Sequence, residues 1–257
     1  MNRRADLRGT GGTPQVPRPA AVDLRWLRLS GLPRGWRPDE TGLALLDQDE
    51  RRRAEALRRP ADRLRFVAAH LGKRTLLGRF LGVGPAEVDL FREPCPLCGQ
   101  PHGRPAVRQP EDSAQALYFS MAHSGDLVLY GFAAVRIGVD VEAAHHGVRD
   151  IASLLHPRER RDLARLPPGA VPGALLRCWV RKEACLKGTG AGIGGGVAEP
   201  YVGVAGLPVA PPGWALADLD TEPGYAAAVA VAQPQAVVHA RGFTLQAALP
   251  AMFQSAS

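Results

Sequence analysis

Apolar and polar residues alternate with a helical period in two long stretches of the chain. Between Arg63 and Leu81, leucine and valine recur at near-helical spacing and Gly82 follows, which predicts an amphipathic helix with a glycine stop. A second stretch, Leu175–Lys187, contains no glycine or proline and is followed by a glycine-rich run. These features predict a second helix that ends close to Lys187.

Shorter segments alternate between apolar and polar residues, or are apolar throughout, and these predict strands. Turn-forming residues separate some of them, most clearly the segment HSGD from His123 to Asp126. Residues 150–166 predict two short helices, broken at Pro157. The predicted strands span residues 22–29, 88–92, 117–121, 127–134, 137–142, 201–204, 214–219 and 225–232. This mixture of helices and strands predicts an α+β fold.

Two predicted elements carry charged residues in a pattern that indicates metal and phosphate chemistry. Residues four apart share a helix face, so Trp179, Glu183 and Lys187 form one stripe of the second helix. Asp140 and Glu142 are two apart on a predicted strand and therefore share one of its faces. Three carboxylates from two elements suit a hard cation such as Mg²⁺, which prefers oxygen ligands.

Each of these patterns also has a simpler interpretation. Asp140 and Glu142 alone are typical of an exposed strand face. Glu183 and Lys187 alone are typical of a helical ion pair, which is worth only about 0.3–0.5 kcal/mol. The metal-site hypothesis therefore depends on these features occurring together.

Three segments together resemble a known family. They are FSMAHSGDLVLYGF (Phe119–Phe132), IGVDVE (Ile137–Glu142) and WVRKEACLKGTGAGI (Trp179–Ile193). Their order and separation resemble the larger, Sfp-like class of 4′-phosphopantetheinyl transferases, whose longer form suits secondary metabolism.

The resemblance implies a monomer of two similar α/β halves related by a pseudo-twofold. Each half is expected to be a small, mostly antiparallel sheet packed on a long helix. Residues 21–112 would form the N-terminal half, on the side of the coenzyme A 3′-phosphate. Residues 113–250 would form the C-terminal half, with the Mg²⁺ and catalytic residues. Residues 1–20 are expected to be a disordered tail, and residues 251–257 a second tail.

The reaction implied is Mg²⁺-dependent transfer of 4′-phosphopantetheine from coenzyme A to a serine of an acyl or peptidyl carrier protein, with release of 3′,5′-ADP. The resemblance assigns the metal to Asp140, Glu142 and Glu183. Either Glu183 or a metal-bound water would take the proton of the serine hydroxyl. Lys187 would hold a phosphate oxygen that gains charge in the transition state, and Lys182 would support it from the same helix.

Further residues are expected to bind coenzyme A on the same basis. Arg65, Lys73 and Arg74 lie on the first long helix, where the family has basic residues that grip the 3′-phosphate. Arg104 stands in place of a lysine that contacts the nucleotide or pyrophosphate, and keeps its charge but not its geometry. His123, in the HS segment, is expected to contact a coenzyme A phosphate.

The chain has 257 residues, a net charge of +7 and a pI of about 9.7. Two explanations of this charge are equally good. One is an arginine-rich proteome, and the other is an anionic partner such as coenzyme A or an acidic carrier protein. In the resembled family, residues 150–166 lie near the carrier-docking surface. No nucleic-acid-binding signature is present, so no nucleic acid is expected. No apolar run approaches a ~20-residue membrane span and no secretory signal is evident, so a cytoplasmic protein is expected.

One cysteine motif is not explained by the resemblance. Cys95, Cys98 and His102, in CPLCGQPH, resemble half of a zinc site, and no second CxxC motif follows to complete it. A tight loop with reduced thiols is the simpler prediction. Three alternatives stay open: a zinc-stabilised binding module, a basic nucleic-acid-binding protein, or an inactive relative that docks carriers. The intact set of carboxylates argues against the last.

Overall fold

The computed structural model describes residues 21–109, 113, 115–144, 148–192 and 199–243. Both predicted long helices are present, as α3 (Pro60–Leu81) and α5 (Val171–Thr189). Each ends at a left-handed glycine, Gly82 with φ 70° and Gly190 with φ 81°. The predicted tails lie outside the described residues. The shorter helices are α1 (Glu40–Ala44), α2 (Gln48–Ala56), α4 (Pro157–Ala164), η1 (Leu29–Gly31), η2 (Pro85–Glu87), η3 (Val148–Leu154) and η4 (Pro168–Ala170).

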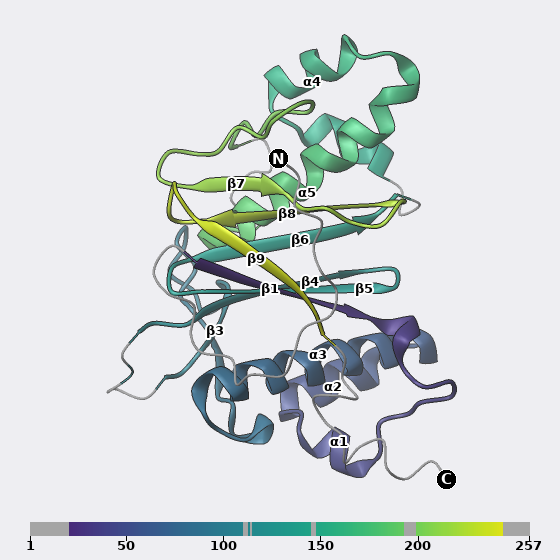
Figure 1. The fold of residues 1–257 in the computed structure, drawn as a ribbon, viewed down its shortest axis with the longest axis vertical. Helices are drawn as coiled ribbons and strands as arrows, with labels where there is room; N and C mark the ends of the chain where they lie inside the picture. The colour runs from purple at the N-terminus through teal and green to yellow at the C-terminus, as the bar shows by residue number, and fades with distance from the viewer. Residues whose placement is uncertain (1–20, 110–112, 114, 145–147, 193–198, 244–257) are drawn as a thin grey trace.

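The β structure of the described residues forms three small sheets, with the orders β4-β5-β1-β9, β6-β8-β7 and β2-β3 (Figure 1). Neighbouring strands are antiparallel except β1 and β9, which are parallel. The expected α+β class is confirmed, while the pseudo-twofold stays a prediction. The strands are β1 (Ala21–Arg28), β2 (Leu90–Arg92), β3 (Pro105–Val107), β4 (Tyr118–Ser124), β5 (Leu127–Ala133), β6 (Ile137–Ala143), β7 (Ala215–Asp218), β8 (Tyr225–Val231) and β9 (Val237–Phe243).

The strands differ from the sequence prediction in four respects. Residues 201–204 form no strand. Strands β3 and β9 were not predicted, because β3 has only three residues and β9 lacks a regular alternation. His123 lies within β4 rather than in a turn. Strand β5 pairs with both β4 and β1, so one sheet contains strands from before and after residue 112, and the division into two halves stays a prediction.

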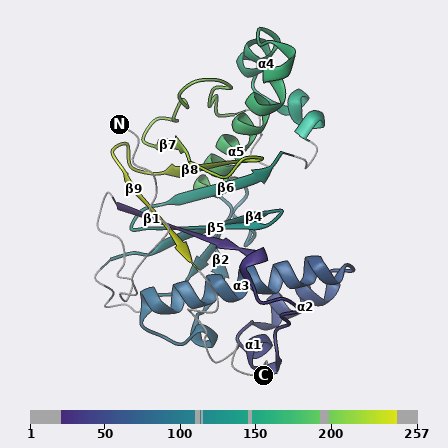
Figure 2. The ribbon, with the colours of Figure 1, turned by 45° about the vertical axis from the view of Figure 1, so that its right-hand side comes forward.

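Helix α3 packs against the four-stranded sheet, and α5 packs against the three-stranded sheet (Figures 1 and 2). The rings of Phe80 in α3 and Phe132 in β5 have centroids 4.6 Å apart. The hydroxyl of Tyr130 donates to the carbonyl of Ala69 at 2.9 Å. From Val67 to Phe80, every residue of α3 except Arg79 is buried. This helix is therefore more deeply enclosed than its apolar stripe predicts.

Two serine hydroxyls join the two larger sheets. Ser120 and Ser124 are four apart on one face of β4, and both are buried. Their oxygens accept hydrogen bonds from backbone N–H groups of β6, from Val139 at 3.1 Å and from Ala143 at 3.0 Å. The hydroxyls therefore satisfy strand amides that would otherwise be buried without partners. An apolar cluster that includes Val139 fills the space beside them.

Gly138 lets α5 approach β6 closely. A Cβ atom at this position would lie 2.0 Å from the carbonyl oxygen of Ala184 and 2.3 Å from the backbone nitrogen of Gly188. Both atoms belong to the α5 backbone and cannot rotate away. The close approach fixes the height of α5 over the strand that carries Asp140.

We expect the substitution Gly138→Ala to destabilise the protein by about 3 kcal/mol or more, because the methyl group overlaps backbone atoms. Urea unfolding followed by tryptophan fluorescence measures the loss. Gly31→Ala is the matched control, since a Cβ at Gly31 meets nothing within 4 Å. The control is expected to change stability by less than about 0.5 kcal/mol. Equal unfolding midpoints for both variants would contradict the close packing of α5 on β6.

Candidate active site

A buried carboxylate and a lysine meet where β6 and α5 pack together. The ammonium of Lys187, on α5, donates to Asp140 Oδ1, on β6, at 2.6 Å. The side chain of Asp140 is 4% exposed and that of Lys187 33% exposed. Asp140 Oδ2 is buried and has no hydrogen-bond partner among the described residues. The helical ion pair that the sequence allowed between Glu183 and Lys187 is replaced by this contact between the two elements.

Two more carboxylates lie close enough to influence Asp140. Burial raises the pKa of Asp140 to about 7; the charges of Glu142 and Glu183 add to the rise, and Lys187 opposes it. Burial also raises the pKa of Glu183, with Glu142 contributing and Lys187 opposing. Within the described part of the chain, Glu183 Oε1 is likewise buried without a hydrogen-bond partner. Unpaired carboxylate oxygens in a buried site are costly unless a ligand or ion satisfies them.

Ser124 holds the third carboxylate. Its hydroxyl donates to Glu142 Oε2 at 2.7 Å while accepting from the backbone N–H of Ala143. The sequence analysis noted the HS segment but gave this serine no role. The sequence signal for a role of Ser124 was its position directly after His123.

These carboxylates have the chemistry of an Mg²⁺ site. Asp140 and Glu183 each have a buried oxygen without a partner, and oxygen ligands are what a hard cation requires. Across the described residues, the oxygens of Asp140, Glu142 and Glu183 are not all within 4.8 Å of one another. Lys187 and Ser124 each engage one carboxylate, so a shared cation needs some side-chain movement.

A histidine on β4 lies near the acidic cluster, and an arginine on α3 lies near this histidine. His123 is near the end of β4. Desolvation lowers its pKa, as do the positive charges of Lys187 and Arg65, whereas Glu142 opposes them. Arg65, on α3, has a half-exposed side chain that pairs with the neighbouring Asp62 at 2.9 Å. Lys187 and Arg65, from two other elements, thus each lie within electrostatic range of His123.

Arg104 lies at the C-terminal end of α5, but its charge is paired. The guanidinium makes two 2.7 Å hydrogen bonds to Glu93 and a longer one, 3.4 Å, to the carbonyl of Gly188. It also lies over the ring of Tyr118, 4.8 Å from the centroid. The side chain is 7% exposed. Arg104 therefore connects the β2–β3 hairpin to α5, and Glu93 is a partner that the sequence analysis missed.

Lys73 and Arg74 lie on α3 as expected, but both are paired inside the protein. Lys73 donates to Glu50 Oε1 at 2.6 Å, and its side chain is 8% exposed. Arg74 is 2% exposed and pairs with Glu50 and Asp47, and it donates to the carbonyl of Val88. Both cations are paired with carboxylates in this structure, and their assignment as coenzyme A ligands stays a prediction. Glu50, which binds both, is 24 residues from Arg74 and was not recognised from sequence.

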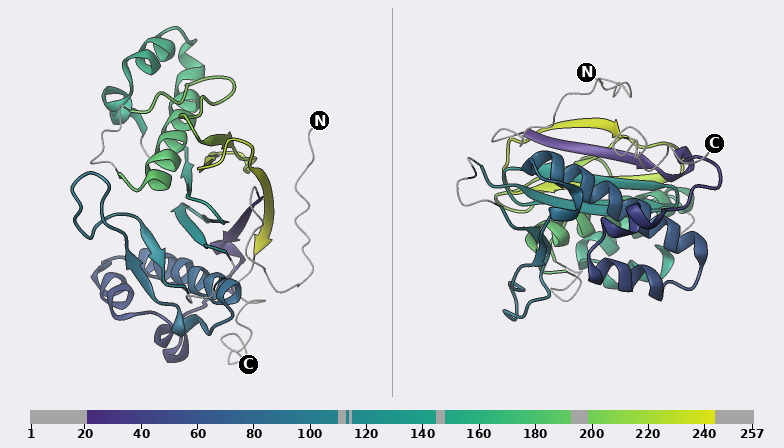
Figure 3. Two further views of the ribbon diagram at one scale, coloured as in Figure 1. Left: turned by 90° about the vertical axis from the view of Figure 1, so that its left-hand side faces the viewer. Right: turned by 90° about the horizontal axis from the view of Figure 1, so that it is seen from below.

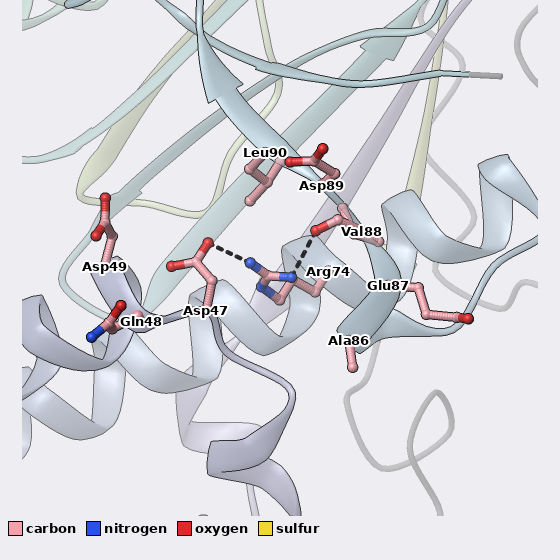
Figure 4. Close-up of a pocket in the computed structure, with 9 residues that line it drawn as sticks. All are labelled: Asp47, Gln48, Asp49, Arg74, Ala86, Glu87, Val88, Asp89 and Leu90. Atoms are coloured by element: carbon pink, nitrogen blue, oxygen red, sulfur yellow. Dashed lines mark hydrogen bonds and ion pairs between the residues drawn. The ribbon is translucent and has the colours of Figure 1, made fainter. Parts of the chain in front are cut away.

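A pocket beside Arg74 is also unsuited to a phosphate. Figure 4 shows the guanidinium directed at Asp47 and the carbonyl of Val88. None of the three carboxylates near Lys187 lines this pocket. Its lining includes four acidic residues, Asp47, Asp49, Glu87 and Asp89.

Lys182 is buried and paired in this structure. Its ammonium contacts Glu159 Oε2, on α4, at 2.9 Å and donates to the carbonyl of Pro200 at 2.7 Å. Neither side chain of the Lys182–Glu159 pair is exposed. Residues three and four apart share a helix face, and Lys182 is off the Trp179–Glu183–Lys187 stripe. Lys182 thus joins α5 to α4, and its expected contribution to binding coenzyme A stays a prediction.

The network around Glu50 predicts a pH dependence of stability. Burial lowers the pKa of His70 to about 4, and the nearby Lys73 adds to this, whereas the hydrogen bond to Glu50 opposes it. Between about pH 4 and 6.5, His70 is therefore protonated in the unfolded chain and neutral in the folded protein. We expect the contribution of His70 to the unfolding free energy to fall by up to about 3 kcal/mol as the pH drops through this window, against the opposite contribution of Asp140, whose pKa is raised. Urea unfolding near pH 5 and pH 7 measures the change, and His70→Gln should remove most of it. An unchanged pH dependence in His70→Gln would contradict the neutral, buried imidazole.

The chain was compared with known proteins. A model of the 4′-phosphopantetheinyl transferase superfamily matches residues 136–212. The 4′-phosphopantetheinyl transferase HetI from Nostoc sp. is 33% identical over 200 residues, which cover 74% of this chain and 79% of the relative. The chain belongs to the 4′-phosphopantetheinyl transferase family. The span of the family model includes Asp140, Glu142, Glu183 and Lys187.

Other members of the family share less of their length with this transferase. A phosphopantetheinyl transferase from Thraustochytrium sp. is 30% identical over 198 residues, which cover 70% of this chain and 64% of the relative. A 4′-phosphopantetheinyl transferase from Bacillus subtilis is 24% identical over 152 residues, with 59% and 63% covered. Family membership confirms an enzyme that transfers phosphopantetheine, with coenzyme A as substrate and a carrier protein as partner. None of the described helices is both long and apolar enough to span a bilayer.

Proposed function

We propose that this transferase moves 4′-phosphopantetheine from coenzyme A to a serine of an acyl or peptidyl carrier protein, in a Mg²⁺-dependent reaction that releases 3′,5′-ADP. One observation carries the proposal: two buried carboxylate oxygens, Asp140 Oδ2 and Glu183 Oε1, lack partners in the described structure beside the ammonium of Lys187. An anionic cluster of this kind favours a cation, and the cation in turn favours a pyrophosphate.

Asp140, Glu142 and Glu183 would hold the Mg²⁺ ion. When bound, Mg²⁺ neutralises the charge of the pyrophosphate and makes its phosphorus easier to attack. Ser124 keeps Glu142 oriented through its 2.7 Å hydrogen bond. Asp140 anchors Lys187 from the buried side. The carboxylates thus lie on a strand and a helix, and not on a loop.

Glu183 and Lys187 are the residues we assign to proton and phosphate handling. Burial raises the pKa of Glu183, which makes it a better acceptor for the serine proton than an exposed glutamate. Lys187 is one-third exposed and has donors left beyond its bond to Asp140. It can therefore donate to a phosphate oxygen as negative charge develops there.

Two basic side chains outside this cluster would bind the remaining phosphates of coenzyme A. Arg65 is half-exposed, and its ion pair with Asp62 is a surface contact that adds little stability, so a phosphate can compete for it. His123 would donate to a phosphate that raises its lowered pKa. Arg104, already neutralised by Glu93, would act at the edge of the site by fixing the hairpin against α5.

An acidic carrier protein would be attracted to α4. Arg160, Arg161 and Arg165 are exposed on or directly after this helix, which adjoins α5 through the buried pair of Glu159 and Lys182. Opposite charges on two partners raise the rate of encounter more than the final affinity. We propose that the protein acts as a monomer in the cytoplasm.

The test is the intact mass of an apo carrier protein after incubation with this protein, coenzyme A and Mg²⁺. A gain of one phosphopantetheine group, roughly 340 Da for this covalent addition, is expected, together with its loss when EDTA removes the metal. Transfer that is unchanged in EDTA would refute the metal dependence. Absence of transfer to each of several acyl and peptidyl carriers would refute the proposed reaction.

A further inference from the structure

The β2–β3 hairpin carries a cluster of metal-binding side chains that the transferase reaction does not use. Cys95 and Cys98 each offer a sulfur and His102 offers a ring nitrogen, and these atoms all lie within 4.8 Å of one another. Cys98 Sγ is 3.0 Å from His102 Nε2. Figure 3 shows the hairpin extending from the body of the molecule. We propose that these three residues bind a zinc ion that clamps the hairpin.

The distances suit zinc without rearrangement of the backbone. Zinc binds cysteine sulfur at about 2.3 Å and histidine nitrogen at about 2.0–2.1 Å, usually as a tetrahedron. Ligand atoms in such a tetrahedron are about 3.5–3.8 Å apart, as follows from those bond lengths. Separations from 3.0 Å to at most 4.8 Å therefore need shifts of about an ångström or less at the ends of three side chains.

The backbone around the cysteines forms a closed turn. Gly99 has φ 72° and its N–H donates to the carbonyl of Cys95 at 2.8 Å, which closes the turn. A positive φ here suits glycine, the residue that follows the second cysteine in the sequence.

Backbone hydrogen bonds also close the base of the loop. The backbone N–H of Cys95 donates to the carbonyl of Gln100 at 2.7 Å, and that of Gly103 donates to the carbonyl of Glu93 at 2.9 Å. A Cβ at Gly103 would lie 2.5 Å from the same Glu93 oxygen, so the two arms of the hairpin approach closely only because this residue is glycine. The cluster is therefore preorganised.

The ligand set defines the metal and its role. Two thiolates and an imidazole favour zinc over Mg²⁺ or Ca²⁺, which prefer oxygen. The described residues supply three ligands, and water would take the fourth position. The same hairpin carries Glu93 and Arg104, which pair with each other, and Arg104 donates to the carbonyl of Gly188 at the end of α5. We assign the ion a structural role, because it would stiffen the segment that holds Arg104 against α5.

The test is the zinc content of the full chain, purified without chelators and without a metal-affinity tag, by mass spectrometry of the metal. About one zinc per chain is expected in the wild type and in the control Cys185→Ala, whose thiol is in the core. Cys98→Ser and His102→Ala should each lose most of it, by roughly tenfold or more. Both replaced side chains are exposed, so these variants are expected to fold, as circular dichroism checks.

Two further measurements separate the remaining outcomes. Replacement of zinc by Co²⁺ should give a thiolate-to-cobalt charge-transfer band that Cys98→Ser weakens. Titration of thiols after denaturation should find all four cysteines reduced. Zinc content that is equal in wild type and Cys98→Ser would overturn the proposal, because the ion would then lie elsewhere. A wild type that holds no zinc after incubation with Zn²⁺, or a Cys95–Cys98 disulfide in the purified chain, would also overturn it.

Discussion

Asp140→Asn and Glu183→Gln are each expected to reduce transfer of phosphopantetheine by roughly 10²–10⁴-fold while leaving the melting temperature unchanged or higher. Each substitution removes the charge of a carboxylate that has one oxygen without a hydrogen-bond partner in the described structure. The side chain keeps its size. The loss of activity follows from the loss of a metal ligand and, for Glu183, of the proposed proton acceptor.

The stability part of this prediction follows from burial. Asp140 Oδ2 is buried without a hydrogen-bond partner in the part of the chain that the structure describes, and burial of this carboxylate opposes folding although Lys187 pairs with Oδ1. Asparagine removes that charge. The ammonium of Lys187 loses its partner but remains one-third exposed, so water can solvate it. Both effects predict no loss of stability at the candidate site.

Thermal unfolding and initial rates of carrier modification measure the two halves of the prediction. Asp89→Asn is the matched control, since this aspartate is exposed and only pairs with Arg108 on the surface. The control should retain full activity and stability. Near-normal turnover in both Asp140→Asn and Glu183→Gln would show that the carboxylates do not hold a catalytic metal.

Glu50→Gln is expected to give the largest loss of stability, about 3–5 kcal/mol. Glu50 accepts hydrogen bonds from Lys73 and Arg74 and also contacts His70 at 2.7 Å. Glutamine keeps the shape but not the charge, so two cations would stay buried with too little compensation. For a chain of this size, such a loss lowers the melting temperature by roughly 6–20 °C.

Chemical denaturation measures this loss, with Glu55→Gln as control because Glu55 is exposed on the same helix. The same network gives a second comparison. Lys73→Met should lower stability and leave the Michaelis constant for coenzyme A unchanged, because Lys73 is used by Glu50. A raised Michaelis constant at unchanged stability would instead support Lys73 as a coenzyme A ligand.

The contrast between Glu183 and Lys182 shows which side-chain positions can be predicted from the sequence and which cannot. The spacing of Glu183 and Lys187 places both on one helix face, and α5 presents them toward β6, which carries Asp140. Such local periodicity is readable from the chain. Lys182 is adjacent in sequence, yet its direction depends on Glu159, a residue of another helix.

The pairing of Lys73 and Arg74 could not be predicted for the same reason. Both residues lie off the apolar stripe of α3, so their charges looked available. Their partner Glu50 comes from α2, and only the packing of the two helices brings it near. The pairing of β1 with β9 was likewise not predictable, because the two strands lie at opposite ends of the described chain. The pattern within a strand does not indicate which distant strand it pairs with.

The parallel pairing of β1 and β9 affects how the protein can fold during synthesis. Ala21 pairs with Val237, so β1 acquires its last neighbour only when roughly 200 further residues have been made. Pairing with β5 is possible much earlier. Until β9 leaves the ribosome, one edge of the nascent sheet is open, and open edges pair readily with other chains. The growing chain is therefore most exposed to aggregation, and has most need of chaperones, during the second half of its translation.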